Sequence, residues 1–371
     1  MRKEAIIVLV SAALLGGCAS IEDVKRAQST ADQAVALARE GKAAAQQGIA
    51  SGNKLAKDAG RMLHAVATPT DAPQAVTGGR WYEGRWGLGP LAMRRYRLFI
   101  PTGGSIRKPL PLLLLLHGCA QDTAAFAAVT RAAATAKSRG FAVLMPEQAQ
   151  EANPQRCWNW FGSDARVGIE TEILMAIVDH AVAEHPRVAG PLFALGLSAG
   201  GSMALTLALN HPERFTAVGS HSGAAPHSAR TPLQAGQAMR GRRSPNAEAV
   251  AQQLAGRRLP PLVLIHGDLD AVVSFESARA SAELWLELLP DGVAVRESVG
   301  EVQRGTRRKL TRSDWKVGGQ PWVRLLRVHG MSHAWSGGAA GQAFSDPTGP
   351  DALRLAWQFF AANMKQAAPA R

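Results

Sequence analysis

The sequence predicts an α/β fold in which a mostly parallel sheet carries helices on both of its faces. From Arg95 onwards, short apolar runs bounded by turn residues alternate with helix-like stretches, as in chains of βαβ units. The run Leu110 to Leu116 is apolar throughout, which is typical of a parallel strand buried on both sides. Ahead of this body, residues 20–66 are rich in alanine and predict a helical spacer.

The expected elements follow in order along the chain. Apolar runs predict an edge strand at residues 96–100 and further strands at 110–116, 141–145, 192–195, 217–219, 262–266 and 323–328. Helices are expected at residues 124–138, 169–185, 199–210 and 351–366. Residues 227–260 are polar, with Gly, Arg and Pro, and indicate an insertion or a lid.

The composition excludes several classes of protein. Hydrophobic residues make up 46% and charged residues 19% of the 371 residues, which excludes disorder for most of the chain. No stretch of about 20 apolar residues is present, so no ordinary membrane-spanning helix is expected. The net charge is +13, but the basic residues are spread along the chain and no nucleic-acid partner is expected. We interpret the densest basic group, residues 304–312, as a solvated loop or edge hairpin, with attraction to anionic polymers or lipid head groups as the alternative.

The N-terminus predicts export and a lipid anchor. Arg2 and Lys3 precede an apolar run at residues 5–15 that is too short to span a bilayer, and Leu15-Gly-Gly-Cys18 follows. This ending resembles a bacterial lipobox, which implies a lipoprotein signal peptide at residues 1–17, a lipid on Cys18 and, from the alanine that follows, the outer membrane. A plain secretory signal with an incidental cysteine is the alternative.

The remaining boundaries and the cysteine count follow from this assignment. Residues 18–79 are expected to hold the lipidated N-terminus, the helical spacer and a linker, and residues 80–371 the globular body. A partner-binding coiled coil is the alternative for the spacer. With Cys18 lipidated, Cys119 and Cys157 remain as an even pair in an oxidising compartment, so we expect a disulfide, with two buried thiols as the alternative.

The motif Gly196-Leu-Ser198-Ala-Gly200 lies directly after a predicted strand and directly before a predicted helix. In this context a G-x-S-x-G match indicates a nucleophile on a sharp turn, because the two glycines let strand and helix pack closely. Ser198 is then the candidate nucleophile, and the N–H of Ala199 faces a developing oxyanion. A structural turn serine is the alternative.

The end of the buried strand offers a second oxyanion donor. Leu116-His-Gly-Cys119 follows that strand, and a turn there directs a backbone N–H, that of Cys119, at the same oxyanion. We expect His117 to be a structural loop histidine, because it precedes the nucleophile.

Two motifs later in the chain supply a candidate acid and base. Asp270 follows the strand at 262–266 and is favoured over Asp268, since it lies further along the loop. His333 follows the last predicted strand, whereas His329 lies at the strand end and is expected to be packed. The order Ser198, Asp270, His333 is that of the α/β-hydrolase fold, in which the histidine takes the serine proton and the aspartate fixes the tautomer of the histidine.

Several runs together resemble the polyhydroxybutyrate (PHB) depolymerase family of esterases, over about residues 90–362. The runs are Leu116-His-Gly-Cys-Ala-Gln-Asp122, Pro146-Glu-Gln148, Asn153-Pro-Gln-Arg-Cys-Trp-Asn-Trp-Phe161, Gly196-Leu-Ser-Ala-Gly-Gly201, His266-Gly-Asp268 and His333-Ala-Trp-Ser-Gly-Gly338. The resemblance implies that Ser198, Asp270 and His333 are the triad and that Cys119, bridged to Cys157, belongs to the oxyanion loop. It also implies that feruloyl and acetyl esters of plant polysaccharides are alternative substrates.

Three tryptophans are candidates for substrate contact. Trp158 and Trp160 flank Cys157, and Trp335 follows His333, so their flat rings are expected to hold an acyl chain or a polymer surface. Trp335 is the first choice. Ordinary packing under the loops is the alternative for each ring.

The expected function is that of a lipid-anchored serine esterase acting on short hydroxyacyl esters, such as 3-hydroxybutyrate oligomers or polyhydroxyalkanoate, through an acyl-enzyme. Family members that attack solid polymer usually carry a separate binding domain, and this chain ends soon after its body, which favours soluble oligomers or small esters. A feruloyl or acetyl-xylan esterase and a non-catalytic envelope scaffold are the alternatives. Neither metal nor cofactor is expected, since no cluster has ligand spacing.

Overall fold

The computed structural model describes residues 78–87 and 89–364. The predicted signal peptide, the lipidation site Cys18, the spacer and most of the linker lie outside the described residues. The strands are β1 (Gly79–Trp86), β2 (Arg94–Pro101), β3 (Leu112–Leu116), β4 (Ala142–Glu147), β5 (Leu192–Leu197), β6 (Ala217–His221), β7 (Leu262–Gly267), β8 (Val295–Val302), β9 (Leu310–Val317), β10 (Gln320–Val328), β11 (Trp335–Ser336) and β12 (Ser345–Asp346). The helices are α3 (Gly89–Ala92), α4 (Thr123–Thr130), α5 (Ala132–Arg139), α6 (Asp164–Glu184), α7 (Ala199–Asn210), α8 (Pro232–Met239), α9 (Ala247–Leu254), α10 (Glu276–Glu287) and α11 (Ala352–Met364), with 3-10 turns at Pro186–Val188 and Pro212–Arg214.

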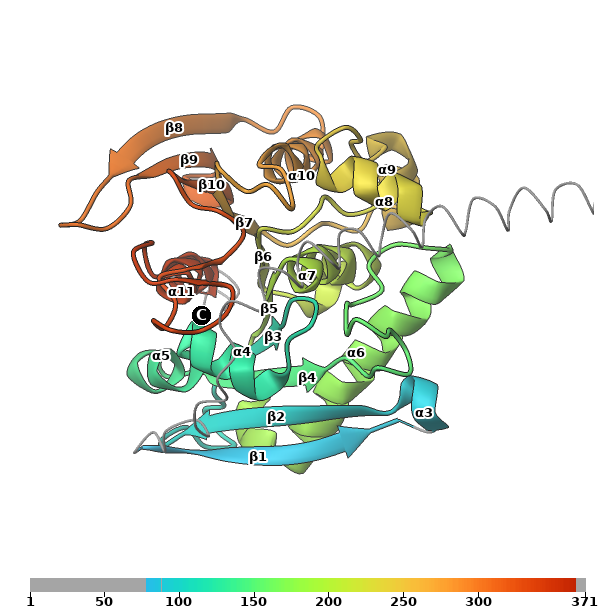
Figure 1. Cartoon of the computed structure of the whole chain (residues 1–371), viewed down its shortest axis with the longest axis vertical. Coiled ribbons are helices and arrows are strands. Elements are labelled where there is room, and N and C mark those ends of the chain that lie inside the picture. The colour runs from blue at the N-terminus through green and yellow to red at the C-terminus, as the bar shows by residue number, and fades with distance from the viewer. Residues whose placement is uncertain (1–77, 88, 365–371) are drawn as a thin grey trace, which may run out of the picture. The chain divides into compact units, whose positions relative to one another are not determined.

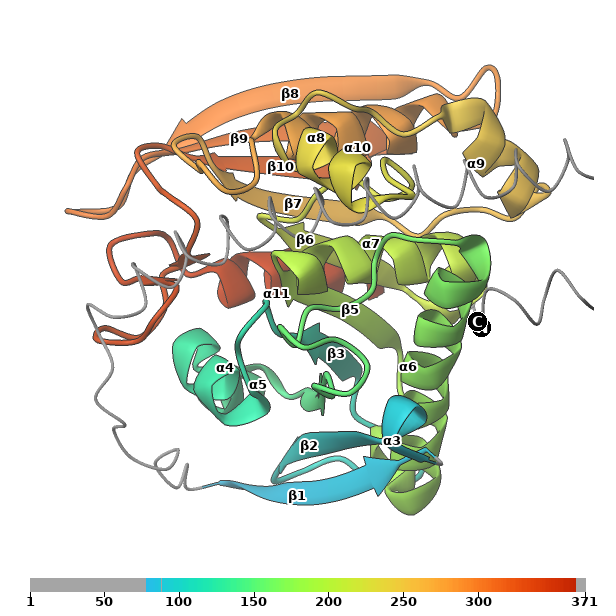
Figure 2. The same cartoon turned by 45° about the vertical axis from the view of Figure 1, so that its right-hand side comes forward.

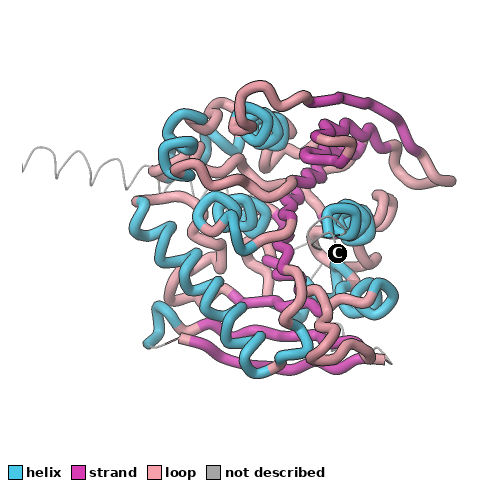
Figure 3. The backbone as a smooth tube through the Cα atoms, turned by 180° about the vertical axis from the view of Figure 1, so that it is seen from behind, coloured by secondary structure: helices cyan, strands magenta, loops and turns pink. Residues whose placement is uncertain are grey.

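Within the described part of the chain, ten strands form one sheet in the order β1-β2-β4-β3-β5-β6-β7-β10-β9-β8 (Figure 1). The strands from β4 to β10 in this order are parallel to one another. Antiparallel ribbons, β2 with β1 and β9 with β8, complete the two edges. The predicted parallel sheet with helices on both faces is therefore confirmed (Figure 3).

The leucines of β3 show why the sheet has two cores. All five are buried, and successive side chains point to opposite faces. Leu112, Leu114 and Leu116 pack in one core with α6, α7 and α10, whereas Leu113 and Leu115 pack in the other with α4, α5 and α11. A strand of this kind has no polar face, which is why its sequence is apolar throughout.

The predicted edge strand is wrong in its position. Residues 94–101 form β2, which lies between β1 and β4, and the true edge is β1, which the sequence did not predict. Two glycines and three charged residues interrupt β1, and its side chains are at most half-buried, so it lacks an apolar face. At the other edge, β8 and β9 form a hairpin around residues 303–309, and β8 is exposed along nearly its whole length.

Two helical regions also differ from the prediction. The expected helix at 124–138 is two helices, because Arg131 adopts a left-handed conformation with φ of 52° between α4 and α5. The predicted insertion at 227–260 contains α8 and α9, whose buried faces (Ala235, Ala238, Val250 and Leu254) pack in the same core as α10 (Figure 2).

The turn from β5 into α7 depends on backbone-to-backbone contact at two glycines. A Cβ atom at Gly196 would lie 2.3 Å from the carbonyl carbon and oxygen of Gly200. A Cβ atom at Gly200 would lie 2.3 Å from the carbonyl oxygen of Leu116, at the end of β3. No side chain fits in either place, so β3, β5 and the start of α7 meet this closely only with glycine at both positions.

We therefore expect Gly196→Ala to destabilise the protein by about 1–3 kcal/mol, because the new methyl group must displace backbone. Gly168→Ala is the matched control: Gly168 lies inside α6, where a Cβ atom meets nothing within 4 Å. That variant is expected to gain up to about 1 kcal/mol from helix propensity. Urea unfolding of both variants measures the difference, and equal stabilities would contradict the close-packing argument.

Candidate active site

Ser198 occupies the strained turn between β5 and α7. Its φ and ψ are 55° and −120°, a conformation that non-glycine residues adopt at a cost of about 1–3 kcal/mol. The Ser198 N–H donates to the carbonyl oxygen of His221 at 2.8 Å, and the side chain is partly exposed. The surrounding backbone thus holds a serine in a conformation that its own energetics oppose.

Asp270 and His333 form a hydrogen-bonded pair. The distance from Asp270 Oδ2 to His333 Nδ1 is 2.7 Å, and the Asp270 side chain is fully buried. Asp270 Oδ1 accepts the backbone N–H groups of Val272 at 2.9 Å and Val273 at 2.8 Å, so both oxygens are fixed. The structure therefore pairs His333 with Asp270 and not with Asp268.

The Asp270 carboxylate is ionised despite its burial. Burial alone raises the pKa of such a carboxyl group, but hydrogen bonds from His266 and His333 outweigh it and hold the pKa of Asp270 below its usual value. His266 Nε2 lies 3.4 Å from Asp270 Oδ2 and also contacts the Val273 carbonyl oxygen at 2.8 Å. An ionised, oriented carboxylate can fix the His333 tautomer that carries its proton on Nδ1.

His221, at the end of β6, links the serine turn to the histidine loop. Its carbonyl oxygen accepts the Ser198 N–H, and its Nε2 accepts the Ser336 N–H at 3.0 Å. Its ring stacks on that of Trp335, with centroids 4.9 Å apart. Ser198, Asp270 and His333 follow β5, β7 and β10, whose carboxyl ends share one edge of the sheet. Sequence reasoning missed His221; the signal was a polar side chain at the end of the strand next to the serine strand.

His221 is neutral at ordinary pH. The pKa of His221 is lowered to about 3, mainly by complete burial and in smaller part by the neighbouring His266 and His333. The hydrogen bonds agree, since Nε2 accepts from Ser336 and Nδ1 lies 3.1 Å from Ser222 Oγ. A proton on Nε2 would face the Ser336 N–H, so protonation would break the link between the two loops.

The predicted oxyanion donors lie on two adjoining segments. Ala199 is the first residue of α7, where N–H groups have no intrahelical partner. The β3 loop packs against the serine turn: a Cβ atom at Gly118 would lie 3.5 Å from the carbonyl oxygen of Leu197. Among the described residues, the N–H groups of Cys119 and Ala199 donate to no protein acceptor. Both remain the candidate oxyanion donors.

A disulfide joins Cys119 to Cys157 and ties the β3 loop to residues 153–161. A buried network supports that segment: the carboxylate of Glu170 accepts hydrogen bonds from Arg94 at 3.1 Å, Gln148 at 3.0 Å and Asn159 at 2.6 Å. His117 is also structural, since its Nε2 accepts the Gln148 N–H at 3.1 Å and burial lowers its pKa.

The three candidate tryptophans are packed, which corrects the prediction that they offer flat faces to a substrate. Trp158 and Trp335 are each 1% exposed and Trp160 is 7% exposed. Trp158 Nε1 donates to the carbonyl oxygen of His117 at 3.0 Å, and Trp335 lies between His221 and Phe126. Each ring is surrounded by protein, so it supports the loops from beneath.

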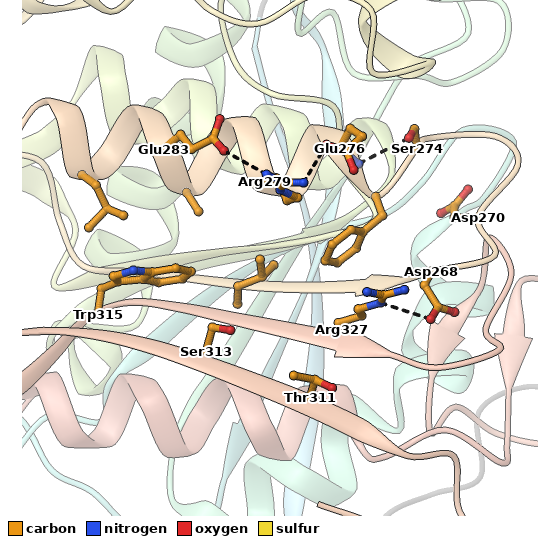
Figure 4. A pocket seen from close by; sticks show the side chains of 14 residues that line it. Asp268, Asp270, Ser274, Glu276, Arg279, Glu283, Thr311, Ser313, Trp315 and Arg327 are labelled. Carbon is orange, nitrogen blue, oxygen red and sulfur yellow. Dashed lines mark hydrogen bonds and ion pairs between the residues drawn. The ribbon is translucent and has the colours of Figure 1, made fainter. Parts of the chain in front are cut away.

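A cavity of about 570 Å³ lies between α10 and the strands β9 and β10 (Figure 4). Both Asp268 and Asp270 line one end of it, and Phe275, Trp315 and Leu325 form apolar parts of its wall. Neither Ser198 nor His333 lines this cavity, so it is separate from the position where Ser198 would attack.

The described residues contain neither a metal site nor a membrane-spanning helix. No group of three or more His, Cys, Asp or Glu side chains in this part of the chain is arranged to hold a metal ion. No helix between residues 78 and 364 is long and apolar enough to cross a membrane.

Replacing Asp270 with Asn removes the acceptor for the His333 Nδ1 proton and favours the wrong tautomer. We expect Asp270→Asn to lower kcat for a nitrophenyl ester about 10,000-fold with little change in KM. Steady-state kinetics measures the effect, and thermal unfolding checks that the variant is folded. A folded variant with normal kcat would contradict the assignment of Asp270.

The pKa of His221 also predicts a pH dependence of stability. The folded-state pKa lies below the unfolded value of about 6.5, so the unfolded chain binds the proton first and stability falls as the pH drops below that value. The loss is up to about 1.4 kcal/mol per pH unit for one proton. Urea unfolding at pH 7, 6 and 5 should show a smaller loss for His221→Gln than for the unmodified protein. Equal slopes would contradict a neutral, buried His221.

Comparisons with known proteins agree with this geometry. The family described as "Esterase PHB depolymerase" matches residues 94–304. Poly(3-hydroxyalkanoate) depolymerase C of Paucimonas lemoignei is 25% identical over 257 residues, which cover 67% of this chain and 60% of the relative. Feruloyl esterase B of Neurospora crassa is 26% identical over 143 residues, or 38% of this chain and 47% of the relative. The chain thus spans about half to three fifths of the length of these two curated relatives.

The solved structure of an acetyl xylan esterase from Aspergillus awamori shares the fold, with a TM-score of 0.59 and 15% sequence identity. The alignment covers 76% of this chain and 99% of that structure. The family match extends over more than half of the chain and includes Ser198 and Asp270. The protein is therefore a member of the PHB depolymerase family of esterases, built on the α/β-hydrolase fold.

Proposed function

We propose that this chain is a serine esterase that hydrolyses short-chain hydroxyacyl esters, such as 3-hydroxybutyrate oligomers or polyhydroxyalkanoate. The observation that carries the proposal is the Asp270–His333 pair, with a 2.7 Å hydrogen bond, at the sheet edge where Ser198 stands in a strained turn. The 25% sequence identity to a poly(3-hydroxyalkanoate) depolymerase over 67% of the chain supports the substrate class.

The first half of the mechanism follows from the roles of these side chains. Ser198 Oγ attacks the ester carbonyl carbon while His333 Nε2 takes the hydroxyl proton, and Asp270 stabilises the resulting imidazolium. The N–H groups of Cys119 and Ala199 donate to the tetrahedral oxyanion, where each such donor contributes about 100- to 1,000-fold in rate. His333 then gives its proton to the leaving alcohol oxygen, and the C–O bond of the ester breaks.

The second half repeats these steps with water. His333 takes a proton from the water as its oxygen attacks the acyl-enzyme, and the Ser198 Oγ–acyl bond breaks with return of the proton to the serine. The carboxylic acid leaves, and the enzyme is restored.

A feruloyl ester is the second candidate substrate, since the match to feruloyl esterase B of Neurospora crassa favours it. A non-catalytic scaffold is disfavoured, because Ser198, Asp270 and His333 are all present and the last two are hydrogen-bonded. We further propose that the protein is exported and anchored through a lipid on Cys18 at the outer membrane. The sequence Leu15-Gly-Gly-Cys18 supports this placement.

We expect the purified full-length protein to release acid from 3-hydroxybutyrate oligomers and from short nitrophenyl esters. Ser198→Ala should lower kcat by a factor of about a million, because it removes the nucleophile. The assay panel adds methyl ferulate and acetylated xylan, and mass spectrometry locates a phosphonate probe on Ser198.

The outcomes separate the candidates. Turnover of ferulate or xylan alone would move the substrate to plant polysaccharide and keep the mechanism. If the folded protein hydrolyses none of these esters and does not react with phosphonate, the proposal of an esterase is wrong and the non-catalytic scaffold is favoured.

A further inference from the structure

A second carboxylate–imidazole pair lies beside the first. Asp268 Oδ2 is 3.0 Å from His329 Nδ1, just as Asp270 Oδ2 is 2.7 Å from His333 Nδ1. Both aspartates stand on the loop after β7, and both histidines on the segment that follows β10. The two pairs therefore join the same two loops, one behind the other.

The contacts of Asp268 fasten these loops together. Its Oδ1 accepts the Gly330 N–H at 2.7 Å, and its Oδ2 accepts from Arg327 Nε at 3.1 Å (Figure 4). Its backbone N–H donates to Val328 at 3.2 Å, and the next N–H donates to Met331 at 3.1 Å. The Asp268 side chain is 12% exposed, whereas the side chains of Arg327 and His329 are 48% and 31% exposed, so the cluster lies near the surface with its carboxylate turned inward.

His329 extends this arrangement to a third strand. Its Nε2 lies 2.7 Å from Thr311 Oγ1, at the start of β9, while its Nδ1 faces Asp268. A neutral ring donates through Nδ1 and accepts the threonine hydroxyl proton at Nε2, so both nitrogens are satisfied. The two hydrogen bonds of His329, with Thr311 and with Asp268, thus hold the end of β10 to β9 on one side and to the loop after β7 on the other.

The charge on Asp268 is also stabilised. Burial opposes ionisation, but the Gly330 N–H and the Arg327 guanidinium outweigh it and hold the pKa of Asp268 below its usual value. The carboxylate is therefore ionised at neutral pH, where it accepts from Gly330, Arg327 and His329.

We propose that Asp268 and His329 are positioning residues that set the His333 ring against Asp270, an inference that rests on the proposed function. We call the Asp268–His329 pair the clamp. Asp270 lies two residues after Asp268, and His333 lies four residues after His329, so the clamp holds the first residues of both loops. A shift of about 1 Å in a reacting group costs on the order of 100-fold in rate, whereas the fold tolerates it. The clamp acts on catalysis through the Asp270–His333 pair and touches no substrate.

The test is Asp268→Asn in the full-length protein, assayed with nitrophenyl butyrate. An Asn side chain would turn its amide nitrogen either to the Gly330 N–H or to Arg327 and His329, and a donor faces it in both orientations, so at least one hydrogen bond is lost. We expect kcat to fall about 10- to 100-fold with KM nearly unchanged. Unchanged kcat in a folded variant would overturn the proposal.

Asp314→Asn is the matched control. Asp314 on β9 is more deeply buried than Asp268, with 3% against 12% of its side chain exposed, and pairs with Arg324 of β10, but it lies away from both loops. This variant should lose stability and keep its kcat. If Asp314→Asn lowers kcat as much as Asp268→Asn, the effect is one of general stability and the positioning role is wrong. If Asp268→Asn fails to fold, His329→Gln decides the question with the same expected fall in kcat.

A double-mutant cycle gives the sharper result. If Asp268 acts through Asp270, the Asp268→Asn change should cost less than about 3-fold once Asp270→Asn is present, because coupled residues are not additive. Full additivity would overturn the proposal. Ser198→Ala distinguishes the two failures: turnover that persists in it overturns the proposed function itself, whereas an inactive Ser198→Ala with normal Asp268→Asn overturns only the clamp.

Discussion

The rest of the site depends on one steric constraint, the contact of α7 with β3 and β5 without any side chain between them. Gly196 and Gly200 permit that contact, and Ser198 between them accepts a positive φ because the backbone around it cannot relax. The same contact brings the segment with Cys119 beside the N-terminus of α7. The candidate nucleophile and the candidate oxyanion donors are thus placed by backbone packing, and a close-packed interior of this kind deforms little.

Around this rigid centre, each buried charge has a polar partner from another segment. Asp270 has two histidines and two backbone N–H groups, and Glu170 has an arginine and two amides. Removing a carboxylate from water is costly unless such donors replace the solvent. The donors come from distant parts of the sequence. The hydrogen bonds to each carboxylate therefore form only when the loops that carry the donors come together. His221 is buried without a charge: its low pKa keeps the ring neutral, so no charge has to be removed from water.

The sequence predicted the central strands and the helices beside them, because full burial leaves an unmistakable apolar run, as in Leu112 to Leu116. It did not predict β1 or α10, and it indicated the β8–β9 ribbon only as a loop or edge hairpin at residues 304–312. Edge strands are half in water, and the buried face of α10 is built largely from alanine and serine, so neither has a clear apolar pattern. Motif order indicated Ser198, Asp270 and His333, whose roles remain predictions. His221 lies in no motif. The motif His266-Gly-Asp268 did not indicate that Asp268 pairs with His329, and the burial of Trp158 and Trp335 depends on tertiary contacts that spacing does not encode.

The exposed edge strand β8 bears on whether molecules of this protein associate with one another. Its outer edge offers a row of unpaired N–H and C=O groups, which is a template for a strand from another chain. Arg296, Glu297 and Glu301 stand along that strand between exposed valines. A strand of a second chain that paired with β8 would lie beside these charged side chains and would have to desolvate them. The charges on β8 therefore keep an open sheet edge from becoming the start of an aggregate.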